Sequence, residues 1–510
     1  MTITTTIRRA TRGLALIAGF TVASCSHDFL DLEPLNGFTA DNFWENERQI
    51  TQAVNSVYAD VRGITTGAMW RLGEYRSDNT TFTENLTDRG QAGVWDDDIF
   101  VSGISVQGAD GMYDGCYSAI KDINLVLANI DKADFDLADG TGEALREQRR
   151  AEARFLRGFF YWMLVRNFGD VAIILEPEFD EADLIQLSRR PVAEVYEQVI
   201  LPDVNFAIKT LPDVYPASDL GRATSGAARM LLAHAHFTRR DYAAALPLLE
   251  EVIGSGLYDL ESDFADVFDG DNSTSSELIF AAQFDNNSGQ GAGYYTSWIP
   301  QNSGTTLTGT ANIAAFGGQN RPTRSIYEAF EDGDLRRDIS IGVYSPRADT
   351  FLYATKFIPP PPITGDKNSA DFPIFRYADA LLMRSEALLE TAGGIPDQVF
   401  LDINAIRARA GVDLIFPGNP DPNLDIQDEE RLRQFLREER RRELAFESHR
   451  WYDLVRYGTV VEVMQAHGEE LATYQPYLND FPSAFTQIPE LYPIPQNEVL
   501  SYGFAQTPGY

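Results

Sequence analysis

The sequence contains few cysteines and no long uninterrupted apolar run. Only two of its 510 residues are cysteines, Cys25 and Cys116. A framework of several disulfides is therefore excluded. No segment reaches the ~20 consecutive apolar residues that a membrane-spanning helix needs. We expect Cys116 to pack as a small buried apolar side chain.

Positive charge is scarce relative to negative charge. The chain has 42 Lys and Arg residues against 76 Asp and Glu residues, which gives a formal net charge of −34 at pH 7. Nucleic acid and bulk anionic glycans are disfavoured as partners, because binding them depends on Lys and Arg. A large net charge keeps a surface solvated and is also used by halophiles. A salty habitat and an ordinary solvated exterior both account for the acid excess.

Motifs for catalysis and for metal binding are absent from the sequence. It has no His-Glu-x-x-His, Gly-x-Ser-x-Gly or phosphate-binding loop. His234 and His236 are two residues apart, which on a helix places them on different faces and disfavours a metal pair. The acidic run 95–98 could hold calcium, but a solvated turn is the favoured interpretation. We expect no enzymatic activity, no catalytic residue, no metal and no cofactor.

The N-terminus has the pattern of a secreted lipoprotein. Three arginines precede a short apolar run, residues 13–22, which is too short to span a bilayer and is typical of a signal peptide. The next residues, Val22-Ala23-Ser24-Cys25, are similar to a bacterial lipobox, which is cleaved before its acylated cysteine. An ordinary signal peptide with an incidental cysteine is the alternative. We predict a lipoprotein signal peptide over residues 1–24 and a lipid anchor on Cys25 that holds the protein stably on a membrane.

Most of the mature chain has the apolar periodicity of paired helices. In "GAARMLLAHAHFTRRDYAAALPLLEEVIGSG", apolar residues recur at helical spacing on both sides of a short polar turn. Its small residues allow two helices to approach closely, and its length is near the about 34 residues of a tetratricopeptide unit. Similar periodicity recurs in residues 46–63, 112–131, 152–171, 192–211 and 375–411. Because one pair cannot bury its own apolar face, we predict a mainly α, tetratricopeptide-like scaffold of stacked pairs.

An irregular segment interrupts this helical pattern. Residues 284–324 are rich in Gly, Asn, Ser and Thr, and their aromatic side chains favour an ordered, functional loop over disorder. A proline run at 359–362 should be extended. We therefore expect an N-terminal helical scaffold over 25–283, a variable loop-rich segment of a binding face over 284–370, and a C-terminal helical part over 371–510 that ends in a Pro-rich tail.

Arginine and glutamate alternate in "REERRRELAFESHRWYDLVR", residues 437–456. The stretch is basic enough to suggest a polyanion site. The alternation, however, favours pairs three and four residues apart along a helix. We interpret the stretch as a structural, salt-bridged helix.

Motifs from one end of the mature chain to the other match one known family. They are "CSHDFLDLEP", "LGEYRSDN", "AEARFLRGFFYWMLVRNFGDV", "GRATSGAARMLLA", "FPIFRYADALLMRSEAL", "REERRRELAFESHRWYDLVRYG" and "LYPIPQNEV". In this order they resemble the SusD/RagB family of outer-membrane nutrient-binding lipoproteins. Ser448 is a departure, since the family more often has Gly there.

The resemblance implies a function and a location. In similar proteins a tetratricopeptide-like scaffold faces a SusC-like TonB-dependent transporter, and a loop-rich face holds a glycan, or sometimes a peptide, for delivery. We therefore expect an oligosaccharide-binding lipoprotein, anchored in the outer membrane and facing the cell surface. The alternatives are a peptide-binding member of the same family, a tetratricopeptide scaffold for envelope assembly, and a glycoside hydrolase whose carboxylate pair is not recognisable.

The resemblance also implies where the ligand lies. In similar proteins the loops that contain "RSDN" and "VWDDD" approach the variable segment across the binding face. Aromatic rings with polar neighbours can stack on the flat C–H faces of sugars, although packing within the loops accounts for these rings equally well. The predicted ligand contacts are Trp95, Tyr294, Tyr295 and Trp298 by stacking, Asp78 and Asn79 to hydroxyls, and Arg321 or Arg324 to hydroxyls or a carboxylate.

Overall fold

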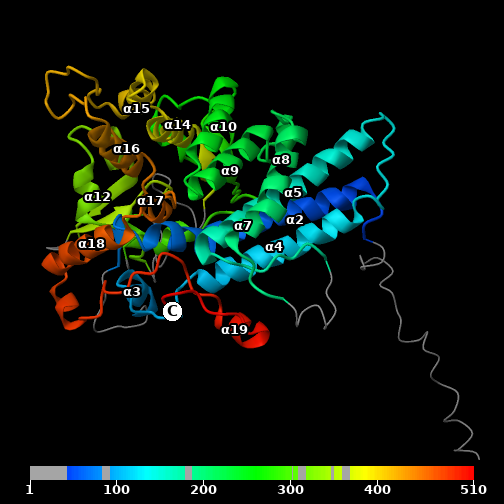
Figure 1. Cartoon of the computed structure of the whole chain (residues 1–510), viewed down its shortest axis with the longest axis horizontal. Helices are drawn as coiled ribbons and strands as arrows, with labels where there is room; N and C mark the ends of the chain where they lie inside the picture. Colours follow the sequence, from blue (N-terminus) through cyan, green and yellow to red (C-terminus); the bar gives the residue numbers. More distant parts are fainter. Residues whose placement is uncertain are drawn as a thin grey trace, which may run out of the picture.

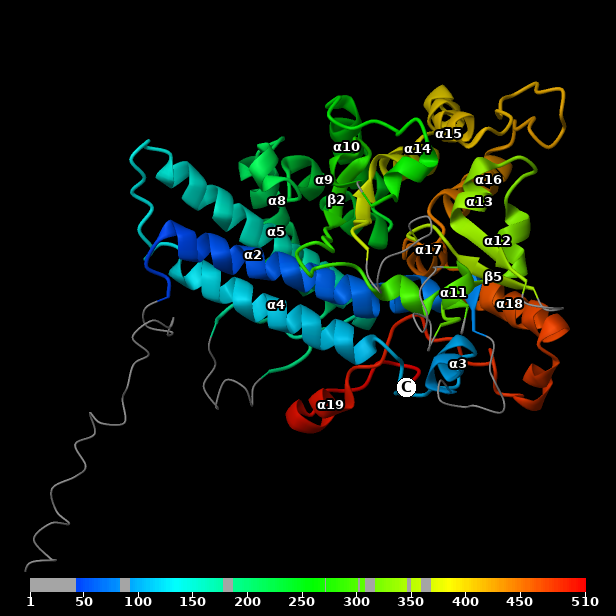
Figure 2. The ribbon, with the colours of Figure 1, turned by 180° about the vertical axis from the view of Figure 1, so that it is seen from behind.

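Helices dominate the fold, and the predicted tetratricopeptide-like class is confirmed. The computed structural model describes residues 43–82, 92–177, 187–270, 272–300, 303–307, 317–345, 350–358 and 368–510. Three long helices lie side by side at one end of the molecule, and the shorter helices of residues 324–340, 429–443 and 460–474 lie at the other end (Figure 1, and from behind in Figure 2). Cys25 and its signal segment lie outside the described residues.

The three long helices are α2 (Glu47–Ile64), α4 (Ala109–Asn129) and α5 (Gly142–Phe168). The aromatic stripe of α5 is buried, as its helical spacing predicts. Cys116 of α4 is also buried, and burial raises the pKa of its thiol. Gly158 lets α5 approach its neighbour, because a Cβ there would stand 2.6 Å from Val204 Cγ2.

The chain then continues as stacked pairs. The helices of this array are α7 (Val192–Val195), η4 (Tyr196–Ile200), α8 (Leu201–Thr210), α9 (Ser225–Thr238), α10 (Tyr242–Gly254), α14 (Tyr377–Thr391), α15 (Asp397–Ala410) and α16 (Glu429–Glu443). Helix α8 packs on α5 and α9, α9 on α10, and α10 on α14. Thr224 and Asp241 cap α9 and α10 by accepting backbone N–H groups. The π-helical turn η4 precedes Pro202, which has no N–H to donate to a helical bond.

Short elements build the rest of the described chain. The remaining helices are η2 (Thr65–Met69), η3 (Arg71–Tyr75), α3 (Ala92–Asp98), η5 (Ala217–Asp219), η6 (Phe264–Val267), η7 (Asn272–Thr274), η8 (Tyr294–Ser297), α11 (Gly304–Leu307), α12 (Arg324–Ala329), α13 (Leu335–Ser340), α17 (Arg450–Tyr457), α18 (Val460–Tyr474), η9 (Pro476–Asp480) and α19 (Gln496–Tyr502). The strands pair antiparallel: β1 (Thr80–Thr81) with β3 (Arg321–Pro322), β2 (Leu278–Ala282) with β6 (Phe372–Arg376), and β4 (Ile341–Tyr344) with β5 (Phe351–Ala354).

The arginine-rich stretch is structural, as interpreted, but its pairing differs from the prediction. Most partners come from other elements: Arg376 of β6 bonds Glu443 (2.7 Å) and Glu447 (2.6 Å), and Arg336 of α13 bonds Glu439 (2.7 Å). A pair within α16, such as Arg442–Glu439 at 2.8 Å, is the less frequent case. The reason is burial, because α16 packs against α12, α14 and α15 and directs Glu439 and Glu443 into the interior.

Candidate ligand-binding face

The segments expected to form the binding face do meet. Strand β1 of the "RSDN" loop pairs with β3 of the variable segment. Thr323 strengthens the contact, since its N–H donates to Asn79 O and its hydroxyl to Asp78 O, both at 2.9 Å. The carboxylate of Asp98 in α3 accepts from Thr81 Oγ1 at 2.8 Å. Three segments that are distant in sequence thus form one connected layer, and the side chains that join them are buried.

Asp78 and Asn79 lie inside this layer rather than on it. Asp78 is only 6% exposed and takes two hydrogen bonds from Arg450, at 2.8 and 2.9 Å, besides an ion pair with Arg441 at 2.9 Å. Burial opposes its ionisation, but the two arginines hold the pKa of Asp78 well below its usual range. Asn79 donates to Glu74 (2.9 Å) and accepts from Arg441 (2.8 Å). The expectation that both bond a sugar is corrected, because their polar atoms already hold the loop to the C-terminal helices.

Trp95 is fully buried, which corrects its expected role as an exposed stacking ring. The centroid of its ring lies 4.5 Å from that of Phe481 and 5.9 Å from that of Tyr477. The polar sequence around it suggested exposure, but α3 turns the ring inward. Burying so large a side chain contributes several kcal/mol to folding, so the core is the expected place for it.

Trp298 and Tyr294 are likewise buried and present no stacking surface. Trp298 contacts Trp70 at a centroid distance of 5.6 Å and Tyr294 at 5.1 Å. Phe357 completes this cluster, 6.0 Å from Trp298. These rings belong to the main hydrophobic core, so the loop segment is anchored in it. The side chain of Tyr295 is outside the part of the chain that the structure describes, so its predicted contact stays a prediction.

Arg321 and Arg324 do reach the surface, each beside an aromatic ring. Arg321 is half-buried, with its guanidinium carbon 5.0 Å from the ring centroid of Phe351. Arg324 is exposed and lies 5.2 Å from the ring centroid of Tyr474. Tyr477, half-exposed, stands next to Trp95 and within electrostatic reach of Arg321. We name the set formed by Arg321, Arg324, Phe351, Tyr474 and Tyr477 the arginine–aromatic patch.

The patch is held in place by the elements beneath it. Strand β3 lies against β5, which carries Phe351. Gln475, between Tyr474 and Tyr477, donates to Thr81 Oγ1 at 3.4 Å and so connects the end of α18 to β1. Burial raises the pKa of the Tyr474 phenol, and the carboxylates of Glu470 and Asp98 add to the shift. The rings beside Arg321 and Arg324 are therefore positioned by neighbouring elements of the fold.

Metal ligands do not gather at this face. Within the described ranges, no three His, Cys, Asp or Glu side chains are arranged to hold an ion. The acidic run 95–98 contains Asp97, which accepts from Gln107 N at 2.7 Å, and Asp98, whose pKa burial raises to about 7. His234 contacts Asp379 while His236 contacts Asp241, on different faces as expected.

Two family models match the chain. The model described as "Starch-binding associating with outer membrane" matches residues 28–236, and the model described as "SusD family" matches residues 339–510. Together they span well over half of the sequence. The chain belongs to the SusD/RagB family.

Full-length relatives agree with this membership. SusD-like protein P25 of Formosa agariphila is 26% identical over 487 residues, covering 88% of this chain and 89% of that protein. SusD-like protein P2 of the same organism is 27% identical over 481 residues, covering 88% and 91%.

Solved structures share the fold. A laminarin-binding SusD-like protein superposes with a TM-score of 0.74 at 25% identity, over 91% of this chain and all of that one. Surface glycan-binding protein A from Bacteroides uniformis superposes with a TM-score of 0.73 at 22% identity, over 91% of this chain and all of that one. This similarity shows a shared fold and nothing more. In this SusD-type chain, no helix of the described ranges is long and apolar enough to cross a membrane.

Three members of the patch were missed by sequence reasoning. Phe351, Tyr474 and Tyr477 stand in "DTFLYA" and "ATYQPY", where aromatic residues have polar neighbours, as Trp95 does. The sequence signal was thus present, but it did not separate rings that turn outward from rings that turn inward. That choice depends on contacts from distant elements.

Proposed function

We propose that this SusD/RagB protein is a nutrient-binding lipoprotein of the outer membrane that captures an oligosaccharide on the arginine–aromatic patch. The observation that carries the proposal is the patch itself, five partly exposed residues on the loop-rich side of the scaffold. The family description names starch binding and the outer membrane, and one solved relative is a laminarin-binding protein.

The chemistry of the patch suits a neutral sugar. Tyr474, Tyr477 and Phe351 offer ring faces for C–H groups, and the guanidinium groups of Arg321 and Arg324 offer several N–H donors for hydroxyls. Contact with the rings orients each guanidinium before a ligand arrives, which lowers the entropy lost on binding. Tyr295 stays a proposed additional contact, from the adjacent η8.

The test is a glycan and peptide array on the soluble form that begins after Cys25, followed by calorimetry with the best oligosaccharide. We expect β-glucan or starch-type oligosaccharides among the binders. Binding only to peptides would favour the alternative that the protein is a peptide-binding member of the family. Binding to neither glycans nor peptides would contradict nutrient capture. Appearance of reducing ends during a long incubation would contradict our expectation that the protein binds without hydrolysing.

We further propose that Cys25 bears the lipid and that a SusC-like TonB-dependent transporter receives the ligand. These proposals rest on the lipobox and on family membership. Mass spectrometry of the native N-terminus should find residues 1–24 removed and Cys25 acylated; an unacylated cysteine would contradict the anchor.

Affinity purification from detergent-solubilised outer membranes should recover a TonB-dependent barrel protein together with this protein. Recovery of the lipoprotein alone would contradict the proposed transporter partner.

A further inference from the structure

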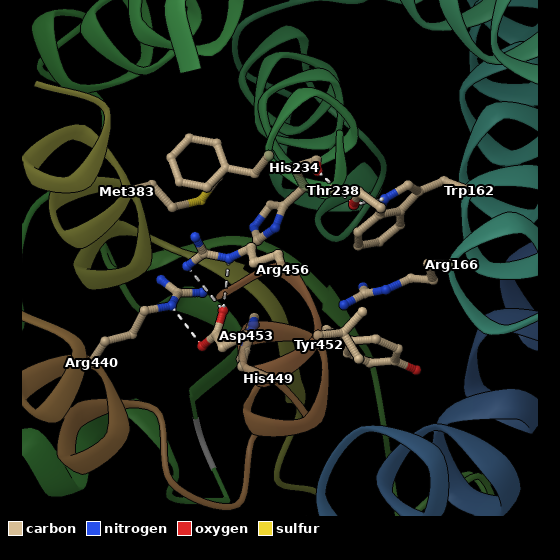
Figure 3. Close-up of a pocket in the computed structure, with 12 residues that line it drawn as sticks. Trp162, Arg166, His234, Thr238, Met383, Arg440, His449, Tyr452, Asp453 and Arg456 are labelled. Carbon is tan, nitrogen blue, oxygen red and sulfur yellow. Dashed lines mark hydrogen bonds and ion pairs between the residues drawn. The ribbon is translucent and has the colours of Figure 1, made fainter. Parts of the chain in front are cut away.

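A narrow pit opens in the helical scaffold, away from the patch. It has a volume of about 50 Å³ and lies where the C-terminal end of α5 meets α9 and α17 (Figure 3). Its walls include Trp162, Arg166, His234, His449 and Tyr452. The proposed sugar-binding function uses none of these residues.

Arg166 is the unusual member of the pit. Its guanidinium carbon lies 4.1 Å from the ring centroid of Trp162 and 3.3 Å from that of Tyr452. Figure 3 shows its guanidinium pointing into the space between Trp162, His234 and Tyr452. It forms no ion pair with any residue that the structure describes, and its Nε is buried without a hydrogen-bond partner. A half-buried guanidinium without a counter-ion is costly.

The nearby carboxylates of Asp453 and Asp379 act on Arg166 through their charge, but each makes its ion pairs with other groups. Asp453 accepts from Arg440 at 2.8 Å through Oδ2 and from Arg456 at 3.1 Å through Oδ1. Asp379 lies behind His234, with 2.7 Å between Oδ2 and His234 Nε2, and its Oδ1 pairs with Arg440. The donors of Arg166 are thus left for something that enters the pit.

The mouth of the pit is basic in a strongly acidic molecule. Thr238 is exposed there, and its hydroxyl accepts from Trp162 Nε1 at 3.1 Å. Arg239 and Arg240 follow it and are also exposed, and Arg240 donates to Val455 O at 3.4 Å. The net charge of −34 repels anions from the molecule as a whole, so the two arginines provide a local positive charge that the neighbouring Asp241, paired with His236, offsets only in part.

We propose that the pit is a binding site for a small free carboxylate anion, held by Arg166. The planar guanidinium matches a carboxylate with two parallel hydrogen bonds. One water needs about 10–15 Å³ by the same measure of volume, so the pit has room for a small anion or for a few water molecules. The site is separate from the sugar face and does not depend on the function proposed above.

The test uses sodium formate, with thermal unfolding of the soluble full-length mature protein as the readout. Formate should stabilise the protein in a saturable manner, since it binds only the folded chain. Arg166→Gln should weaken the apparent affinity for formate by about tenfold or more, because it removes the bidentate donor. Arg154→Gln is the matched control on the same helix: Arg154 also covers a ring, Phe206 at 4.4 Å, but has Asp203 as counter-ion at 3.7 Å. It should bind formate like the parent.

Other outcomes overturn the proposal. Equal formate binding by Arg166→Gln and the parent, or no saturable effect in the parent up to about 100 mM, would mean that the pit holds water only. The affinity should fall from formate to acetate to propionate, as the anion becomes larger. If propionate binds most tightly, the site is built for a carboxylate group on a larger molecule and not for a small free anion. If Arg166→Gln does not fold, crystals of the parent soaked in bromide decide, because an anomalous peak must appear beside Arg166.

Discussion

At the scale of single residues, Ser448 has two unfavourable features. Its φ of +66° lies in the left-handed region, and its buried hydroxyl has no hydrogen-bond partner. Relief of both should outweigh the entropy cost of glycine, so Ser448→Gly should stabilise the protein by about 1 kcal/mol in urea unfolding. Ser385 of α14 is the control, since its hydroxyl is also buried and unpartnered but its backbone is helical. Ser385→Gly should instead be destabilised by up to about 1 kcal/mol, and the same sign in both variants would contradict the argument.

The two kinds of aromatic residue at the binding face should respond differently to truncation. Tyr474→Ala should weaken oligosaccharide binding by about 1–3 kcal/mol, taking base stacking on aromatic rings as a guide, and leave folding nearly unchanged. Trp95→Ala should instead destabilise the fold by about 3–5 kcal/mol, because the ring is fully buried. Calorimetry and urea unfolding of both variants separate the effects. Reversed results would place the ligand on Trp95.

His467 gives the fold a dependence on pH. Burial lowers the pKa of His467 to about 4, and both ring nitrogens are buried without partners. Between pH 4 and 6.5 the unfolded histidine binds a proton and the native one does not, so stability falls as the pH is lowered through this window. His467→Phe should reduce the loss of unfolding free energy between pH 6.5 and pH 4 by about 3 kcal/mol, which corresponds to a pKa shift of this size. Urea unfolding at several pH values measures this, and parallel curves for parent and variant would contradict it.

At the scale of elements, the helices could be predicted from the sequence and the orientation of loop side chains could not. The spacing of apolar residues over 226–256 already defines α9, its turn and α10. The meeting of the "RSDN" loop with the variable segment followed from the family resemblance and is found in β1 and β3. The burial of Trp298 depends on Trp70 and Phe357, which are distant in sequence, so no local pattern reveals it.

The ion pairs of α16 should differ in strength along the helix. Glu443 is fully buried and contacts Arg336, Arg376 and Arg409. Glu443→Gln removes the negative charge that these three arginines share and turns an N–H₂ group toward them, which should cost about 3–5 kcal/mol. Glu429→Gln, at the exposed start of the same helix, removes only a surface pair with Arg433 and should cost under about 1 kcal/mol. Urea unfolding compares the two, and equal losses would show that burial does not decide the strength of these pairs.

At the scale of the whole molecule, the acid excess should make stability depend on salt. The net charge of −34 lies mostly outside the buried ion pairs, and repulsion among surface carboxylates favours the unfolded chain. Raising NaCl from about 10 mM to about 1 M shortens the screening length from about 30 Å to about 3 Å. Screening weakens this repulsion but barely reaches the interior pairs of Arg336 and Arg376, so the melting temperature should rise. The rise should be equal in Arg166→Gln, because screening does not require chloride in the pit. A flat response would mean that surface pairs already cancel the repulsion, and a rise only in the parent would assign the effect to chloride bound at Arg166.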